Sequence, residues 1–153
     1  MLKNNDNDIE LMQEALREAE IASSRQEVPI GAVVVYQNKI IARAHNRKEE
    51  LQDPIAHAEI LALQQAAQYL GSWHLEDVEL YVTLEPCPMC AYAMLQARIK
   101  RLVFGTPDPK AGAAGSIINI VQDKRFNHQI EVASGVLEEE CRLILQKFFQ
   151  KRR

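Results

Sequence analysis

Hydrophobic positions along the chain follow two spacings, one typical of helices and one typical of strands. Apolar residues recur every three or four positions in four segments, which predicts amphipathic helices over residues 8–24, 57–69, 88–98 and 137–151. Short β-branched runs predict five strands, over residues 31–36, 39–44, 78–84, 101–105 and 130–133. The polar pair Gln37-Asn38 suits a tight turn, so the first two strands form a predicted hairpin. One more helix is expected between residues 105 and 130.

The order of these elements predicts the fold class. Strands that alternate with helices after an initial hairpin indicate an α/β sandwich whose sheet includes parallel pairs. The 153 residues, 47% of them hydrophobic, suit a single domain over residues 1–153. No apolar run approaches the roughly 20 residues of a membrane span, and the polar N-terminus lacks a signal-peptide pattern. We therefore expect a cytoplasmic protein without a membrane partner.

Charge is distributed unevenly along the chain. The formal net charge is −3, which argues against a nucleic-acid partner. However, residues 1–97 carry 7 basic and 15 acidic side chains, whereas residues 98–153 carry 11 basic and 6 acidic ones. Such asymmetry fits either a polyanion-binding face or a solvated helix surface, and charge alone leaves both open.

Two clusters of metal-binding residue types lie at the starts of predicted helices. His57-Ala58-Glu59 begins one helix, and Cys87-Pro88-Met89-Cys90 begins another. Cys-x-x-Cys places two thiols on one side of a first helical turn, where unpaired N–H groups favour the thiolate. Zinc accepts thiolate and imidazole ligands, and three protein ligands leave one position for water, as in catalytic sites. We therefore predict that His57, Cys87 and Cys90 bind one Zn²⁺.

Glu59 is the predicted catalytic residue. It lies two positions after His57, within reach of a metal-bound water instead of the metal itself. A carboxylate there can accept a proton from that water and return it to a leaving group.

Two alternatives remain for the cysteine pair. It fits a redox motif, or a closed structural zinc site if a fourth ligand exists. Candidates for a fourth ligand form no second Cys/His pair; they are His45, His74, His128 and Cys141.

The joint pattern of His57-x-Glu59 and Pro86-Cys87-x-x-Cys90 resembles the cytidine/deoxycytidylate deaminase superfamily. From about residue 8 onward, the chain is similar to the bacterial tRNA-specific adenosine deaminases. The segments that carry this similarity are Val28–Val33, Ala44–Arg47, Asp53-Pro54, Ala56–Ile60, Leu80–Cys87, Arg101–Gly105, Gly112–Ser116 and Phe148–Arg153. The resemblance implies a three-layer α/β/α sandwich around a central mixed five-stranded sheet of the cytidine deaminase type.

The same resemblance implies an activity. Members of that family act as homodimers with one zinc ion per subunit. They convert adenosine to inosine at the wobble position, the first anticodon nucleotide of tRNA. Zinc-bound hydroxide would attack adenine C6, with Glu59 as the proton shuttle. The expected partner is thus a tRNA anticodon stem-loop.

The resemblance also implies substrate contacts near the metal. Asn46 would hydrogen-bond the flipped base or its ribose, although Asn is also common in turns. The Ala58 backbone would contact the base edge, and the Val28–Ile30 loop with Pro29 would wall the pocket.

Residues further along the chain have the chemistry of RNA contacts. Asp108 can accept a hydrogen bond from a ribose 2′-hydroxyl and Lys110 can contact a phosphate, although two prolines in that loop also suit a plain rigid turn. At the C-terminus, Phe149 and Arg152 combine an aromatic ring with a cation, as in stacking and phosphate contacts. The alternative there is a core phenylalanine, Phe148, followed by a frayed basic tail.

Two other functions compete with tRNA deamination. A deaminase of free guanine, cytosine or a nucleotide keeps the zinc site but needs no basic C-terminal third. A zinc-stabilised RNA-binding scaffold needs neither Glu59 nor a metal position left for water.

Overall fold

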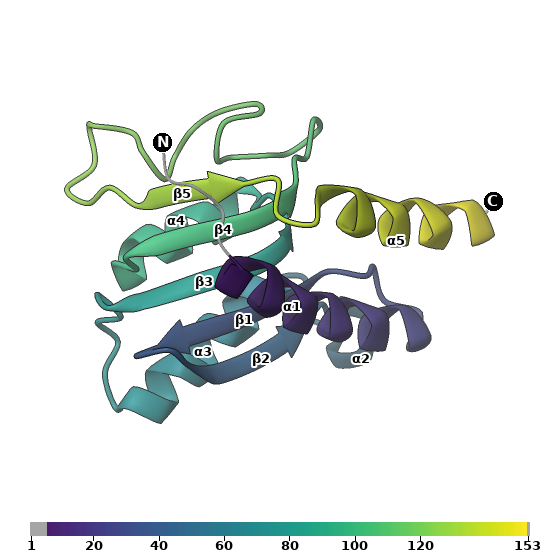
Figure 1. The fold of residues 1–153 in the computed structure, drawn as a ribbon, viewed down its shortest axis with the longest axis horizontal. Helices are drawn as coiled ribbons and strands as arrows, with labels where there is room; N and C mark the ends of the chain where they lie inside the picture. The colour runs from purple at the N-terminus through teal and green to yellow at the C-terminus, as the bar shows by residue number, and fades with distance from the viewer. Residues whose placement is uncertain (1–5, 153) are drawn as a thin grey trace.

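A mixed five-stranded sheet forms the centre of the computed structural model, which describes residues 6–152 (Figure 1). Its strand order is β2-β1-β3-β4-β5. The strands are β1 (Gly31–Tyr36), β2 (Lys39–His45), β3 (Val78–Leu84), β4 (Arg101–Thr106) and β5 (Glu131–Ser134). β1 is antiparallel to both β2 and β3, whereas β3, β4 and β5 are parallel. The predicted combination of a hairpin with parallel strands is confirmed.

Helices cover both faces of this sheet (Figure 1). α1 (Asp6–Ser24) and α5 (Glu138–Lys151) lie on one face, and α3 (Ala58–Leu70) and α4 (Pro88–Ala97) lie on the other. The predicted three-layer α/β/α sandwich is therefore confirmed. None of the helices described is long and apolar enough to cross a membrane.

The strands alternate their side chains between two cores. On β1, Val33 and Val35 pack with α1 and its neighbours, whereas Ala32 and Val34 pack with α3 and α4. On β3, Tyr81 faces the first core, and its neighbours face the second. All three layers thus bury apolar surface, which is why the central strands are hydrophobic throughout.

The structure differs from the sequence prediction in two connections. No helix forms in the segment 107–130, which consists of turns and one isolated bridge between Ala114 and Asn119. That prediction was wrong because Pro107 and Pro109 cannot donate to a helix, and the Glu85 carboxylate binds amides of this segment instead. A short helix, α2 (Lys48–Leu51), was missed because four residues show no periodicity. Other ends differ by one or two residues.

The topology brings several chain segments to one edge of the sheet. Gly31 pairs with His45, so the start of β1 lies beside the end of β2. Because β1 is antiparallel to β3, the end of β3 lies at the same edge, and Leu84 pairs with Thr106 at the end of β4. The segments 28–30, 46–57, 85–90 and 107–116 therefore meet there. α5 continues past this edge (Figure 1).

Candidate active site

Two helices begin at this edge, and each is capped by a predicted metal ligand. His57 is the N-cap of α3, and Cys87 is the N-cap of α4, both with extended backbone dihedrals. Pro88 occupies the first turn of α4, where its missing N–H costs no helical hydrogen bond. Cys90 lies one turn into α4 and is fully buried. The imidazole and both thiols therefore face one another across the two helix starts.

The distances among these side chains fit one tetrahedral ion. His57 Nδ1 lies 3.7 Å from Cys87 Sγ and 3.4 Å from Cys90 Sγ. All three candidate ligand atoms lie within 4.8 Å of one another. Zinc bonds of about 2.3 Å to sulfur and about 2.0 Å to nitrogen imply a sulfur–nitrogen separation of about 3.5 Å in tetrahedral geometry. The donor set and its spacing therefore suit zinc.

The two thiols of this cluster differ in acidity. The hydrogen bond from the Cys90 thiol, together with one from His57 and one from the Cys90 amide, lowers the pKa of Cys87 to about 4. Donating that hydrogen bond and being buried both raise the pKa of Cys90. Cys87 is therefore the thiolate of the pair, and a metal would have to displace the proton of Cys90.

Glu59 lies in the first turn of α3 and is only 4% exposed. Burial raises the pKa of Glu59 to about 7, and His57 and Cys90 oppose that shift only partly. A carboxyl group with such a pKa can both accept and release a proton near neutral pH. It adjoins the ligand cluster and so has the chemistry of a proton carrier.

The residues expected to contact the base lie at the same edge of the sheet as the cluster. Asn46 follows β2 and is buried, and its backbone N–H donates to the carbonyl of Ile30, 3.1 Å away. The Asn46 Oδ1 atom is buried without a hydrogen-bond partner among the described residues. Pro29 is buried in the adjoining segment, and Ala58 is the first residue of α3, where an amide has no acceptor within the helix. Asn46 and Ala58 thus offer polar groups that a ligand could satisfy.

A groove of about 660 Å³ brings together residues predicted from distant parts of the chain. Asp108, Lys110 and Phe149 all line it, and Phe149 is 48% exposed. The Asp108 carboxylate also accepts hydrogen bonds from the amides of Lys110 and Ala111, at 3.0 and 3.2 Å. Asp108 therefore stabilises its own turn while it lines the groove.

Sequence reasoning missed three groove residues on α5, namely Arg142, Leu145 and Gln146. Their spacing was the available signal, since residues three, four and seven positions before Phe149 share its side of a helix.

The end of α5 is held against the molecule. Phe148 is buried, and the Arg152 guanidinium lies over its ring, 4.7 Å from the centroid. Arg152 also donates a hydrogen bond to the carbonyl of Gln26, 3.1 Å away. This exposed cation lies near the segment that leads into β1, whereas Arg153, the last residue of the predicted basic tail, lies outside the described residues.

Glu85 binds the segment after β4. Its Oε1 accepts hydrogen bonds from the Asp108 amide at 3.0 Å and the Ser116 hydroxyl at 2.5 Å. Its Oε2 accepts from the amides of Ala114 and Ser116, at 3.0 and 3.1 Å. Burial alone would raise the pKa of Glu85, but these hydrogen bonds hold it below its usual value.

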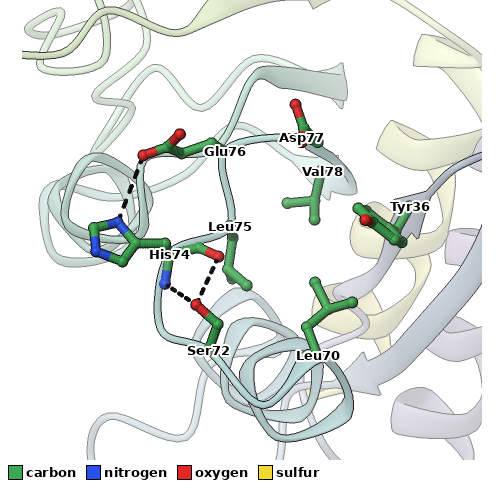
Figure 2. Close-up of a pocket in the computed structure, with 8 residues that line it drawn as sticks. All are labelled: Tyr36, Leu70, Ser72, His74, Leu75, Glu76, Asp77 and Val78. Carbon is green, nitrogen blue, oxygen red and sulfur yellow. Dashed lines mark hydrogen bonds and ion pairs between the residues drawn. The ribbon is translucent and has the colours of Figure 1, made fainter.

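Figure 2 shows a separate cavity, of about 420 Å³, at the opposite end of β3. Ser72, His74 and Glu76 are its interacting polar residues, and Tyr36, Leu70 and Val78 add apolar surface. None of the predicted site residues lines it. Its polar residues interact with one another within the loop 72–76: the His74 amide donates to the Ser72 hydroxyl, and the His74 ring pairs with Glu76. This cavity therefore forms no part of the predicted site.

Comparison with known proteins shows which family the chain resembles. The MafB19-like deaminase family matches residues 6–153. A tRNA-specific adenosine deaminase of Bacillus subtilis is 55% identical over 93% of this chain and 88% of its own length. One from Streptococcus pyogenes is 44% identical over 93% and 89%. A structure solved in a study of A-to-I editing by tRNA:A34 deaminases at the wobble position of transfer RNA matches with a TM-score of 0.86 and 47% identity, covering 89% of this chain and 99% of that one.

The fold and these matches together define the class of protein. The chain belongs to the MafB19-like deaminase family, and its relatives place it among the tRNA-specific adenosine deaminases.

The unequal acidity of the cysteines makes alkylation a test of the cluster. In chelator-treated protein at pH 6, iodoacetamide should modify Cys87, which is a thiolate above about pH 4. Cys90 should resist because its pKa is raised, and Cys141 because burial raises its pKa to about 12. Mass spectrometry of the digested protein locates the label. Added zinc should protect Cys87, and equal labelling of all three cysteines would contradict this account.

Proposed function

We propose that residues 1–153 act as a single deaminase domain that hydrolyses adenosine to inosine at the wobble position of tRNA, in a zinc-dependent reaction. The observation that carries the proposal is the convergence of His57, Cys87 and Cys90 beside the buried Glu59. The curated relatives are named for this activity, which supports tRNA as the substrate. A substrate of this kind supports a cytoplasmic location.

His57, Cys87 and Cys90 would bind one zinc ion per subunit, because their atoms have the spacing of a tetrahedral site. Bound zinc would supply a Lewis acid that makes water a nucleophile near neutral pH. Three protein ligands fit such a catalytic site better than a structural one, which takes four.

Glu59 is the catalytic acid and base in this proposal. Deamination replaces the C6 amine of adenine with oxygen from water and releases ammonia. Glu59 accepts a proton from the attacking water and delivers it to the departing nitrogen. Burial raises its pKa and so makes the carboxylate a better proton acceptor, whereas a bound cation would lower the pKa and so favour release of the proton. Burial also keeps bulk water from competing for the proton.

The base would enter beside Asn46. The unpartnered Asn46 Oδ1 and the Ala58 amide offer an acceptor and a donor to a flipped base or its ribose, and Pro29 walls the pocket.

The anticodon nucleotides next to the flipped base would lie in the groove. Phe149 offers a stacking surface, Lys110 a phosphate contact and Asp108 an acceptor for a 2′-hydroxyl. Arg152 adds a cation beyond the groove.

We further propose a homodimer through the outer face of α3 and α4. An apolar groove of about 400 Å³ runs between these helices and includes Ile60, Ala67 and Ala93. Trp73, also on this groove, is 61% exposed. Apolar surface of this kind is characteristic of a protein interface, and a second copy is the partner that the family resemblance supplies.

An activity assay tests the main proposal. The protein should form inosine in an unmodified tRNA with adenosine at the first anticodon position, and none from free bases or nucleosides. Glu59→Ala should lower kcat by about 10³-fold, because general acid–base catalysis contributes that order of rate. Zinc content, measured by plasma emission, should stay at one per chain in this variant.

Other outcomes of that assay identify the competing functions. Activity on guanine or cytosine without activity on tRNA would overturn the proposal in favour of a free-base deaminase. A zinc-loaded protein without any activity would favour a scaffold, and loss of zinc from Glu59→Ala would make Glu59 a ligand.

The basic end of α5 should contribute to RNA affinity through phosphates. Removal of Lys151, Arg152 and Arg153 should weaken tRNA binding and flatten its salt dependence by roughly 0.7 log units per log unit of salt for each lost contact. Fluorescence titration at several salt concentrations measures both. The control is Lys39→Ala with Lys100→Ala, which removes two cations at the opposite edge of the sheet. An unchanged slope in the truncated protein would exclude the tail from binding.

The dimer proposal is tested by a charge placed in the α3–α4 groove. Gln64 is exposed and lines the groove, so Gln64→Lys should shift sedimentation-equilibrium mass from dimer toward monomer. Gln13→Lys makes the same change at an exposed position of α1, on the other face of the sheet, and it should remain dimeric. A wild-type monomer at micromolar concentration would contradict the proposed assembly.

A further inference from the structure

Glu85 is a buried carboxylate that the proposed reaction does not use. It directly precedes Pro86 and Cys87 in the chain and is only 2% exposed. Its four hydrogen bonds all come from the segment 107–116, by way of Asp108, Ala114 and Ser116. The side chain therefore binds the loop after β4, whose first residues line the groove.

We propose that Glu85 is a positioning residue for RNA binding: its carboxylate fixes the segment 107–116 so that Asp108 and Lys110 stay at the groove. This inference rests on the proposed function, because the groove is there assigned to the anticodon. Glu85 itself touches neither substrate nor metal in this account. It acts through the backbone that it binds.

The partners of Glu85 require a group that only accepts hydrogen bonds. Each carboxylate oxygen receives two donors, Oε1 from Asp108 and the Ser116 hydroxyl, Oε2 from Ala114 and the Ser116 amide. Glutamine has the same shape, but its NH₂ group would replace one oxygen and face donors. In either orientation of the amide, Glu85→Gln therefore loses at least one backbone hydrogen bond from the loop, and it creates no cavity.

The loop is shaped around the carboxylate. A Cβ atom added at Gly112 would collide with the carboxyl group of Glu85, so only glycine lets the backbone pass this close. Gly112 in turn donates a hydrogen bond to the carbonyl of Asp108 at 2.9 Å, and Ala113 donates to Pro86 at 2.8 Å. The loop is thereby tied both to Glu85 and to the residue before the first cysteine ligand.

The position of Asp108 follows from these bonds. Its amide donates to Glu85, while its own carboxylate accepts from the amides of Lys110 and Ala111. Pro107 and Pro109 have no N–H to donate and restrict the backbone on either side. Glu85 is thus the side chain outside the loop that sets where the Asp108 turn lies along the groove.

The test compares substrate affinity with turnover. In zinc-loaded Glu85→Gln, KM for an anticodon stem-loop RNA should rise roughly tenfold, the effect expected from loss of a hydrogen bond to a charged group. The kcat should stay within about threefold of wild type, since general-base and metal residues keep their places. Amide hydrogen exchange in 108–116 should accelerate roughly tenfold, because the loop opens more often.

Two further variants are compared with Glu85→Gln for their KM and loop exchange. Ser116→Ala removes one of the four donors and leaves the backbone bonds, so it should raise KM less than Glu85→Gln does. Glu79→Gln is the matched control: it makes the same change at the other end of β3, in a carboxylate that pairs with Arg101 and not with the loop. Its KM and loop exchange should equal those of wild type.

Several results would overturn the assignment. A Glu85→Gln protein with faster loop exchange but unchanged KM would show that loop order does not serve binding. A fall in kcat together with zinc below one per chain would make Glu85 a support of the metal site instead. If the wild-type enzyme fails to deaminate the RNA, the proposed function fails, whereas unchanged exchange in Glu85→Gln would refute the loop anchor by itself.

Discussion

The site depends on one constraint, namely that α3 and α4 begin at the same edge of the sheet. α4 starts directly after β3, and α3 precedes β3 and runs in the opposite direction along it. The two N-caps, His57 and Cys87, therefore meet above the end of one strand. Both helix starts present unpaired amides, and this environment favours the thiolate that a cation needs. The placement of the candidate metal ligands thus follows from the connectivity of the fold.

The same convergence explains why a carboxyl group is buried here. Glu59 follows the N-cap of α3 by two residues, so the turn that places His57 also directs Glu59 toward the thiols. Removal from water raises its pKa to about 7, and the neighbouring thiolate adds to that shift. A surface glutamate would remain a weak base. Burial therefore gives this side chain a pKa suited to the proposed proton transfer, at the cost of desolvating a charge.

The parts of the fold and site that sequence could predict were those with local signals. Apolar residues repeating every 3.6 positions predicted the four main helices, and β-branched runs predicted all five strands. The motif residues His57, Glu59, Cys87 and Cys90 lie together in the structure, as their joint pattern predicted. The segment 107–130 was mispredicted because its backbone is organised by a distant side chain, Glu85, whose hydrogen bonds have no periodic signature. The prediction of the groove residues on α5 was incomplete for a similar reason. Helical spacing can group Arg142 with Phe149, but only the packing of α5 beyond the sheet edge shows what that side faces.

Charge was the least informative sequence feature, and the structure shows why. Arg101 counts toward the basic C-terminal third, yet it is buried in ion pairs with Asp8 and Glu79 and adds nothing to the surface. Arg125 is paired with Asp123. By contrast, Lys110 lines a groove whose other walls are largely apolar, and Arg142 lines the same groove while paired with Glu139. Recognition of a single-stranded nucleic acid requires a few cations beside stacking surfaces, and this local arrangement decides binding more than the sum over half a chain. A slightly acidic protein can therefore have an edge suited to RNA.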